Sequence, residues 1–460
     1  MASIEKAVND SSQTLPVQLD SDVRETQKDT PFSIFVNREK KWISFVASFG
    51  AMFSTLSSYI YMPAVVPIAT DLGVSIALVY LTVTSYLVVA GIAPAFMGDI
   101  ADQAGRSYGA AYGVLSDITT VAERGSYVGS LILFTNAAPS FGPVIAGVFA
   151  ERLSWRWIFW FLVILTGTYW VVVLLLLPET QRKVVGNGSI PTQGIYKSLF
   201  DFVTRDRKSE LNEGQLQGTA NKRKHHIPNP FKCIPLLFSK GNFSVIMVGS
   251  ITYTVKMTLQ TSLAAQCIEV YGLNYLQAGL IYLPSGVGGA LASYTTGKFL
   301  DRNIKKLSSM HGTYRRGEDI SDFPIEQARF AGIYTLIVIS AIGTAAYGVS
   351  LMKRTHIHGK PPPNVMKESG LTTIKLCGTL LTDLNPHASA TVQASYNLVR
   401  CLGAGVGIAV QQPLTDAAGL GWCFGVFSVV MLLATPLAMA LRRCGLGWRR
   451  ERTSKRSLAV

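Results

Sequence analysis

Long stretches without any charged residue are the feature that most limits what this chain can fold into. Seven of them run over Trp42–Ile68, Ser75–Met97, Tyr127–Ala150, Trp157–Leu177, Leu276–Gly297, Phe330–Met352 and Leu420–Leu441. About 20 mostly apolar residues cross a bilayer as one helix, so each stretch predicts a membrane span. Phe243–Cys267 and Ala388–Leu414 each hold one internal cation, Lys256 and Arg400, and bring the predicted spans to nine. Two apolar pieces, Ser107–Leu115 and Leu371–Leu381, are shorter than a span.

The composition agrees with a chain that is embedded in a membrane for most of its length. Charged residues make up 15% of the 460 residues, against roughly 25% in soluble domains. No G-x-x-x-x-G-K-[ST] loop occurs, which argues against a pump driven by ATP. The six cysteines and the loop histidines show no metal-ligand spacing, so we expect no metal site, no cofactor and no enzyme chemistry.

The net charge of +14 is concentrated in four regions that we expect to face the cytoplasm. These are the N-terminal arm, the polar segment 178–242, the connection between Gly297 and Phe330, and the tail after Leu441. Of the connections on the opposite side, Ala69–Val74 and Glu269–Tyr275 carry no Lys or Arg, and Ala150–Arg156 carries two. Since cytoplasmic loops are enriched in these cations, the asymmetry predicts a multi-pass protein of the plasma membrane with a cytoplasmic N-terminus. Nucleic-acid binding would need a soluble domain to present the charge, and the sequence predicts none.

The predicted spans fall into two halves around the central polar segment. We expect a polar arm (1–41), a helical half (42–177), a basic loop (178–242), a second helical half (243–441) and a basic tail (442–460). The fold class is an all-α integral membrane protein. Nine crossings that start inside would leave the cationic tail outside the cell. We therefore expect Leu371–Leu381 to cross as a short, strained tenth helix.

A short motif recurs directly after the second span of each half. Its first copy has Gly98, Asp102, Gly105 and Arg106, and its second copy has Gly297, Asp301 and Arg302. A carboxylate where a helix leaves the membrane pairs with cations and with helix N-termini, and glycines permit a tight turn. Such a cluster predicts a conformational lock that holds one state and releases in another. The alternative is a solvated loop turn.

With this repeat the sequence resembles the major facilitator superfamily, and within it the fungal drug:proton antiporters with twelve spans. Five further strings carry the resemblance: Gly142-Pro143-Val144-Ile145-Ala146-Gly147, Leu177-Pro178-Glu179-Thr180, Tyr271-Gly272-Leu273-Asn274, Asp383-Leu384-Asn385-Pro386 and Asn397-Leu398-Val399-Arg400-Cys401. The resemblance implies a monomeric two-half helical bundle in the lipid bilayer. It also implies export of a small organic compound, drug-like or a secondary metabolite, by alternating access with protons as the driving ion. Nutrient uptake is the weaker alternative.

The resemblance further implies that parts of the twelve-span bundle are absent. After Arg106 the chain continues with Ser107-Tyr108-Gly109, which resembles the later part of the fourth family helix. The third helix and an arginine that the family carries early in the fourth would be missing. The polar segment 353–370 leaves only Leu371–Leu381 of the tenth helix. A truncated or mis-spliced, transport-inactive chain is therefore the alternative to an exporter.

Gly142, Pro143 and Gly147 are candidates for a gate. Proline kinks a membrane helix, and glycines let a neighbouring helix approach closely. In the family this stretch resembles the seal that is associated with export. The alternative is plain helix packing.

Lys256 and Arg400 are the two cations near the middle of a predicted span. An unpaired cation there costs several kcal/mol, so each side chain needs a cavity or a partner. For Arg400, a structural ion pair and a role in substrate or proton coupling stay open. Further candidates to line a substrate cavity are Tyr59, Tyr61, Asn136, Gln260, Gln393 and Asn397. No acidic residue lies deep in a long predicted span, so the sequence shows no carboxylate proton carrier there.

Overall fold

The computed structural model is helical throughout the part of the chain that it describes. It describes residues 33, 35–104, 114–115, 118–119, 123–178, 180, 185, 237–311, 324–354, 363–385 and 389–457. The helices are α2 (Asn37–Tyr59), η1 (Met62–Ala64), α3 (Val65–Leu72), α4 (Ile76–Ala104), α6 (Arg124–Arg152), α7 (Arg156–Leu176), α12 (Lys240–Tyr271), α13 (Tyr275–Leu280), α14 (Leu283–His311), α15 (Ile325–Arg329), α16 (Ile333–Met352), α17 (Pro363–Leu384), α18 (Ser389–Leu432) and α19 (Ala434–Ser457).

Six segments of the described chain are long and apolar enough to cross a membrane. They are Asn37–Leu72, Ile76–Pro94, Gly129–Arg152, Arg156–Leu176, Ile325–Met352 and Thr391–Glu451. The last has 61 residues and bends at Gly419, whose φ of 81° is left-handed, so it supplies two of the predicted spans. The predicted span Phe243–Cys267 forms α12, whose polar residues meet other helices because most of the helix is buried.

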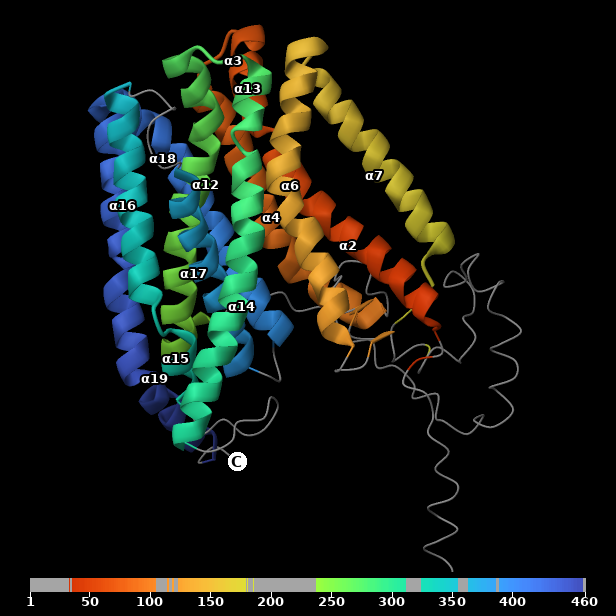
Figure 1. The fold of residues 1–460 in the computed structure, drawn as a ribbon, viewed down its shortest axis with the longest axis vertical. Coiled ribbons are helices and arrows are strands. Elements are labelled where there is room, and N and C mark those ends of the chain that lie inside the picture. The colour runs from red at the N-terminus through yellow and green to blue at the C-terminus, as the bar shows by residue number, and fades with distance from the viewer. Residues whose placement is uncertain are drawn as a thin grey trace, which may run out of the picture.

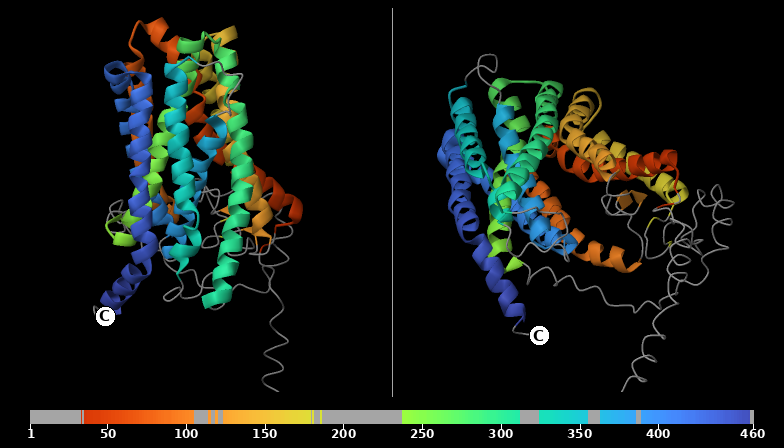
Figure 2. Two further views of the ribbon diagram at one scale, coloured as in Figure 1. Left: turned by 60° about the vertical axis from the view of Figure 1, so that its left-hand side comes forward. Right: turned by 60° about the horizontal axis from the view of Figure 1, so that its bottom comes forward.

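The helices form two groups that meet at one end (Figure 1). We call the end that carries α3 and α13 the upper end, and the end where α12 begins and α14 ends the lower end. One group comprises α12–α19, and the other comprises α2, α6 and α7. Towards the lower end α2 and α6 diverge from α14, and the right view of Figure 2 shows the same division. The protein is thus an all-α bundle of two halves, closed above and splayed below.

The helix α4 belongs to the first half by sequence but packs along α18 of the second half. The Thr84 hydroxyl donates to the Gly405 carbonyl at 3.1 Å, and the Asn397 amide donates to the Ala90 carbonyl at 3.0 Å. Gly91 permits this approach, because a Cβ there would lie 3.0 Å from the Cβ of Cys401. The α4–α18 contact therefore joins the two halves.

The expectation of a short, strained tenth helix is wrong. The helix α17 has 22 residues, which at 1.5 Å per residue spans about 33 Å. It begins at Pro363, and proline is favoured in the first helical turn because its missing N–H would have no partner there. It packs against α12, α14 and α16, so protein rather than lipid surrounds much of its surface. Local apolarity alone therefore underestimated its length.

The repeated motif is more helical than expected. Gly98 and Asp102 lie inside α4, and Gly297, Asp301 and Arg302 lie inside α14. Both helices continue past these positions, so no tight turn lies at any of these five residues. Gly105, Arg106 and most of Ser107–Leu115 lie outside the described residues, as do most of the arm and the central loop.

Candidate functional site

The upper end is closed by an unusually close contact between α6 and the helices α13 and α14. A Cβ at Gly147 would lie 2.6 Å from the Tyr275 carbonyl oxygen, and a Cβ at Gly279 would collide with the Pro143 carbonyl. The Glu151 carboxylate also accepts the Tyr275 N–H at 3.1 Å. Backbone on both sides of this contact cannot move aside as a flexible side chain would. The glycines therefore set how closely the two halves meet.

Gly142 faces the other side of α6, toward α2. A Cβ there would lie 3.1 Å from Leu56 Cδ1 and 3.3 Å from the Ile60 nitrogen. The helix α6 runs continuously through Pro143. The candidate gate motif thus lies between α2 of its own half and α13 of the other half. This position suits the predicted seal, and it is also the close packing that we named as the alternative.

Arg400 lies on α18, where that helix runs beside α12. Its Nε and Nη2 atoms donate to Asn397 Oδ1 at 3.1 and 2.8 Å. Its guanidinium carbon lies 4.8 Å from the centre of the Tyr253 ring and 5.5 Å from that of Tyr396. These distances suit cation–π attraction, which is strongest where water is excluded. Two tyrosines and one amide therefore hold the guanidinium in place.

Among the described residues, none places a carboxylate within 4.0 Å of Arg400. The structural ion pair that the sequence left open for this arginine is thus not formed in this part of the chain. The guanidinium carries its charge beside the contact between the halves, because Asn397 also donates to Ala90 of α4. Arg400 is half-buried, so part of its surface stays accessible.

The tyrosines and the amide predicted in the first half lie in three different places. Tyr59 is buried, and its hydroxyl lies 3.5 Å from Met257 Sδ on α12, close to the Arg400 group. Tyr61 instead bonds to Thr82 at 2.9 Å and packs edge-on against Phe159. Asn136 is half-buried on α6, and its backbone carbonyl oxygen faces Gly286 of α14.

The two glutamines predicted for the cavity make different contacts. The Gln393 side chain donates to the Gly378 carbonyl at 2.7 Å and to Thr382 Oγ1 at 2.9 Å, which ties α18 to α17. Gln260 is buried on α12, and its backbone carbonyl accepts the Tyr282 hydroxyl at 2.6 Å. The Gln260 side-chain oxygen has no hydrogen-bond partner among the residues whose placement is described.

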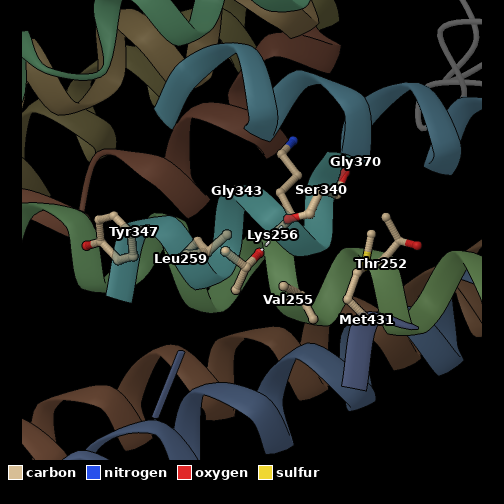
Figure 3. Close-up of a pocket in the computed structure, with 10 residues that line it drawn as sticks. Thr252, Val255, Lys256, Leu259, Ser340, Gly343, Tyr347, Gly370 and Met431 are labelled. Carbon is tan, nitrogen blue, oxygen red and sulfur yellow. Dashed lines mark hydrogen bonds between the residues drawn. The ribbon is translucent and has the colours of Figure 1, made fainter. Parts of the chain in front are cut away.

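Lys256 lines a small pocket inside the second half, between α12, α16 and α17 (Figure 3). Val255, Leu259 and Tyr347 form part of its wall, and the Lys256 ammonium lies on the Gly370 side. About 20 Å³ is open to the centre of a water molecule, which is room for one or two waters. Lys256 thus lines a pocket whose volume suits one or two waters and is too small for a bulky organic compound.

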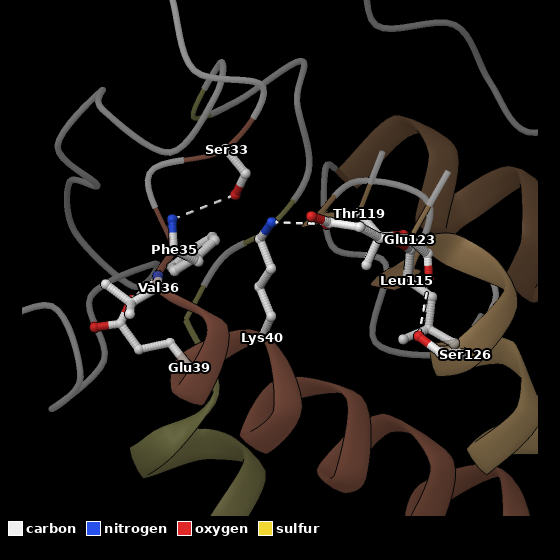
Figure 4. A network of polar contacts seen from close by, with 9 residues as sticks. All are labelled: Ser33, Phe35, Val36, Glu39, Lys40, Leu115, Thr119, Glu123 and Ser126. Atoms are coloured by element: carbon white, nitrogen blue, oxygen red, sulfur yellow. Dashed lines mark hydrogen bonds and ion pairs between the residues drawn. The ribbon is translucent and has the colours of Figure 1, made fainter. Parts of the chain in front are cut away.

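Pairs of polar side chains fasten the lower end of each half. In the first half Lys40 of α2 binds Glu123 at 3.1 Å (Figure 4). In the second half Arg329 binds Asp383 at 2.7 Å, and both side chains are more than nine-tenths buried. We did not predict these pairs. Their signal in the sequence was only that Asp383 lies in a string shared with the fungal subgroup.

A second polar contact joins α12 to the end of α17 near the buried Arg329–Asp383 pair. Asn242 and Asn385 exchange side-chain hydrogen bonds at 2.9 and 3.3 Å. Arg302 of the repeated motif is exposed. Within the described ranges, no group of three or more His, Cys, Asp or Glu could hold a metal ion.

The sequence family fits this arrangement. The model of the Major Facilitator Superfamily matches residues 105–352, more than half of the chain. The chain belongs to the Major Facilitator Superfamily. Like its superfamily relatives it is a membrane transporter and not an enzyme.

Several curated relatives of the superfamily cover most of the chain. The MFS-type transporter phiD of a fungal species is 32% identical, over 95% of this chain and 73% of its own. Citrate exporter 1 of Aspergillus niger is 34% identical, over 93% of this chain and 90% of its own. The MFS-type transporter tstD of Talaromyces stipitatus is 31% identical, over 94% of this chain and 86% of its own. These names support a membrane efflux transporter.

Solved superfamily structures share the fold at low identity. A POT family transporter in complex with 5-aminolevulinic acid has a TM-score of 0.52 and 11% identity, over 88% of this chain and 96% of its own. The human organic anion transporter MFSD10 has a TM-score of 0.50 and 12% identity, over 87% of this chain and 99% of its own. Both agree with the two-half helical bundle.

Proposed function

We propose that the protein exports a small organic compound, a secondary metabolite or a drug-like molecule, across the fungal plasma membrane by alternating access. The observation that carries the proposal is the closed upper end, where Gly147 and Gly279 bring the halves together while α2 and α6 splay from α14 below. If the N-terminus and the cationic segments lie in the cytoplasm, this is a state that loads substrate from inside. The fungal relatives, among them a citrate exporter, support export.

Protons are the proposed driving ion, with one protein copy as the transport unit. Of the described acidic side chains, those of Glu326 and Asp383 are buried. Asp383 is bound to Arg329, and Glu326 lies 3.4 Å from Arg449. A carboxylate that exchanges its cation for a proton couples protonation to the position of a helix. Glu326 is the proposed proton acceptor, because a proton on Asp383 would leave the buried charge of Arg329 without its partner.

The proposed lock at the start of the first-half loop tests the alternating-access part. We expect Asp102→Asn and Arg106→Ala to abolish export while the protein stays in the membrane, because both charges serve a state-dependent contact rather than the folded core. The measurement is extrusion of a preloaded fluorescent substrate panel from yeast, with membrane yield followed in parallel. Unchanged extrusion in both variants would show that these residues form a solvated loop turn and not a lock.

A transport-inactive, shortened chain is the second candidate. The alignment with the MFS-type transporter clz19 spans 500 positions, more than the 460 residues of this chain, so the relative carries residues that this chain lacks. A deletion after Arg106, where the family resemblance breaks, would account for part of this difference in length. Sequencing cDNA across Arg106–Ser107 and across Met352–Leu371 separates the candidates. A transcript that encodes this chain unchanged, together with export against a gradient, excludes the inactive form.

A further inference from the structure

We infer that Arg400 binds a carboxylate group of the exported compound, with an aromatic or apolar body lying against the half-buried Tyr253 ring beside it. The inference rests on the proposed function, since it names the substrate class of that site. It assigns one atom group to one residue and is therefore testable without knowing the natural compound.

The donor geometry of Arg400 leaves one edge open for an anion. A guanidinium has five N–H donors, and here Nε and one N–H of Nη2 point to Asn397 Oδ1. Beside this pair, the Cys401 thiol lies in hydrogen-bonding reach of the guanidinium and is a weak acceptor, and Asn397 Oδ1 is the one described oxygen that accepts an N–H of Arg400. The Nη1–Nη2 edge of a guanidinium binds both oxygens of a carboxylate through parallel hydrogen bonds.

The charge balance points to the same ligand. A guanidinium inside a membrane bundle is costly, and cation–π contacts with Tyr253 and Tyr396 offset only part of that cost. No described carboxylate completes the balance. A single guanidinium neutralises a single negative charge, which favours a monoanionic carboxylate over a doubly charged phosphate.

The rings beside Arg400 are fixed well enough to select an aromatic body. The Tyr396 hydroxyl donates to the Ile374 carbonyl at 3.2 Å, and Tyr59 of the first half lies against Met257. Fixed tyrosine rings offer apolar contact area at little entropic cost. Tyr59 and Tyr396 are themselves buried, so the half-buried ring of Tyr253 is the aromatic surface beside the charged anchor.

Asn397 links the anion site to the movement of the halves. Its Oδ1 orients Arg400, while its Nδ2 donates to the Ala90 carbonyl of α4 at 3.0 Å. When α4 and α18 separate, this bond breaks and Arg400 loses its fixed orientation. Asn397 is thus a positioning residue that would weaken carboxylate binding in the opposite state, which favours release.

The test is equilibrium binding to the purified full-length protein in lipid nanodiscs, with radiolabelled naphthylacetate as probe. Naphthylacetamide, the methyl ester and naphthyl phosphate serve as competitors. We expect the acid to compete about 10- to 100-fold better than the amide or the ester, since a hydrogen-bonded charge pair is lost in both. This comparison needs no variant, so it holds even if a substitution disturbs folding.

Variants locate the site. Arg400→Gln should weaken acid binding about 10- to 100-fold and leave amide binding unchanged. Arg400→Lys keeps the positive charge but loses the two parallel N–H donors. Its affinity for the acid should lie between those of the unchanged protein and Arg400→Gln. Asn397→Ala should weaken acid binding by about three- to tenfold with the charge intact. Arg442→Gln is the matched control, because Arg442 contacts the ring of Tyr334 at 5.7 Å elsewhere in the same half.

Three results would overturn the inference: equal binding of acid and amide, tighter binding of the phosphate, or no binding of any probe. Transport is measured separately in proteoliposomes. Arg400-dependent acid binding without transport would defeat the proposed export function and leave the carboxylate site standing. Transport of neutral compounds alone, without acid binding, would support the proposed export function and defeat the carboxylate site.

Discussion

The helices α16 and α7, one from each half of the bundle, are buried to very different degrees. In the second half, α16 places Ile333 and Ile337 fully inside, between its neighbours. In the first half, Trp160, Val163 and Trp170 of α7 are 60–62% exposed. A helix bundle loses packing where a neighbouring helix is absent, so the shortened chain proposed as the second candidate would leave α7 exposed in this way. The first half is held as much by the second half as by itself.

The lower-end fastenings of the two halves differ in the same direction. Arg329 and Asp383 in the second half are 8% and 4% exposed, whereas Glu123 in the first half is 46% exposed. Removing one partner of a buried ion pair leaves the other charge uncompensated, while an exposed partner is simply solvated. The comparison therefore predicts unequal costs for equivalent substitutions.

The largest expected effect is on stability, at Asp383. Asp383→Asn should lower the free energy of unfolding by about 3–5 kcal/mol, because Arg329 stays buried with its charge unpaired. Lys40→Met in the first half should cost about 1 kcal/mol or less, since Glu123 reaches solvent. Thermal unfolding of the purified protein in detergent measures both.

A double variant controls for the size of the side chains at this pair. Arg329→Met combined with Asp383→Leu should recover most of the stability lost in Asp383→Asn, because apolar residues of similar volume replace a buried ion pair at little cost. Equal losses in Asp383→Asn and Lys40→Met would show that the two fastenings are equivalent and that burial does not separate the halves.

The next effect in size concerns the contact between the halves. Gly279→Ala forces a methyl group against the Pro143 carbonyl, and overpacking of this kind costs about 1–3 kcal/mol. The closed upper end would be disfavoured, and export should fall by roughly tenfold. Gly129→Ala is the matched control, because a Cβ there meets nothing within 4 Å. Equal export by the two variants would show that the close contact at Gly279 does not act as a seal in transport.

The spans were predictable from the sequence because lipid imposes a length and an apolar surface on any helix that it surrounds. That rule weakens where protein replaces lipid, which is why Leu371–Leu381 gave too short a helix for α17. Polar pairing was not predictable, since Arg329 and Asp383 lie 54 positions apart and no local spacing connects them. The requirement that Arg400 find a cavity or a partner was predictable from charge alone, but its two tyrosine neighbours were not.

Some buried polar groups lack the hydrogen bonds that the buried tyrosine hydroxyls near them make. Tyr80 of α4 is 1% exposed, and its hydroxyl has no hydrogen-bond partner among the described residues. In the same part of the chain, the side-chain oxygens of Gln260 and Gln411 have none either. A buried polar group without a partner disfavours the state that buries it. These groups would regain hydrogen bonds to water when the upper end opens.

The smallest expected effect follows from removing one of these groups. Tyr80→Phe should stabilise the closed state by about 1 kcal/mol, so the protein melts slightly higher while export slows by a few-fold. Tyr282→Phe is the opposite control, because the Tyr282 hydroxyl donates to the Gln260 carbonyl at 2.6 Å and its loss should lower stability. Paired measurements of thermal unfolding and export rate distinguish the two. A lower melting temperature for Tyr80→Phe would mean that the hydroxyl is satisfied in the closed state and that opening gains nothing from it.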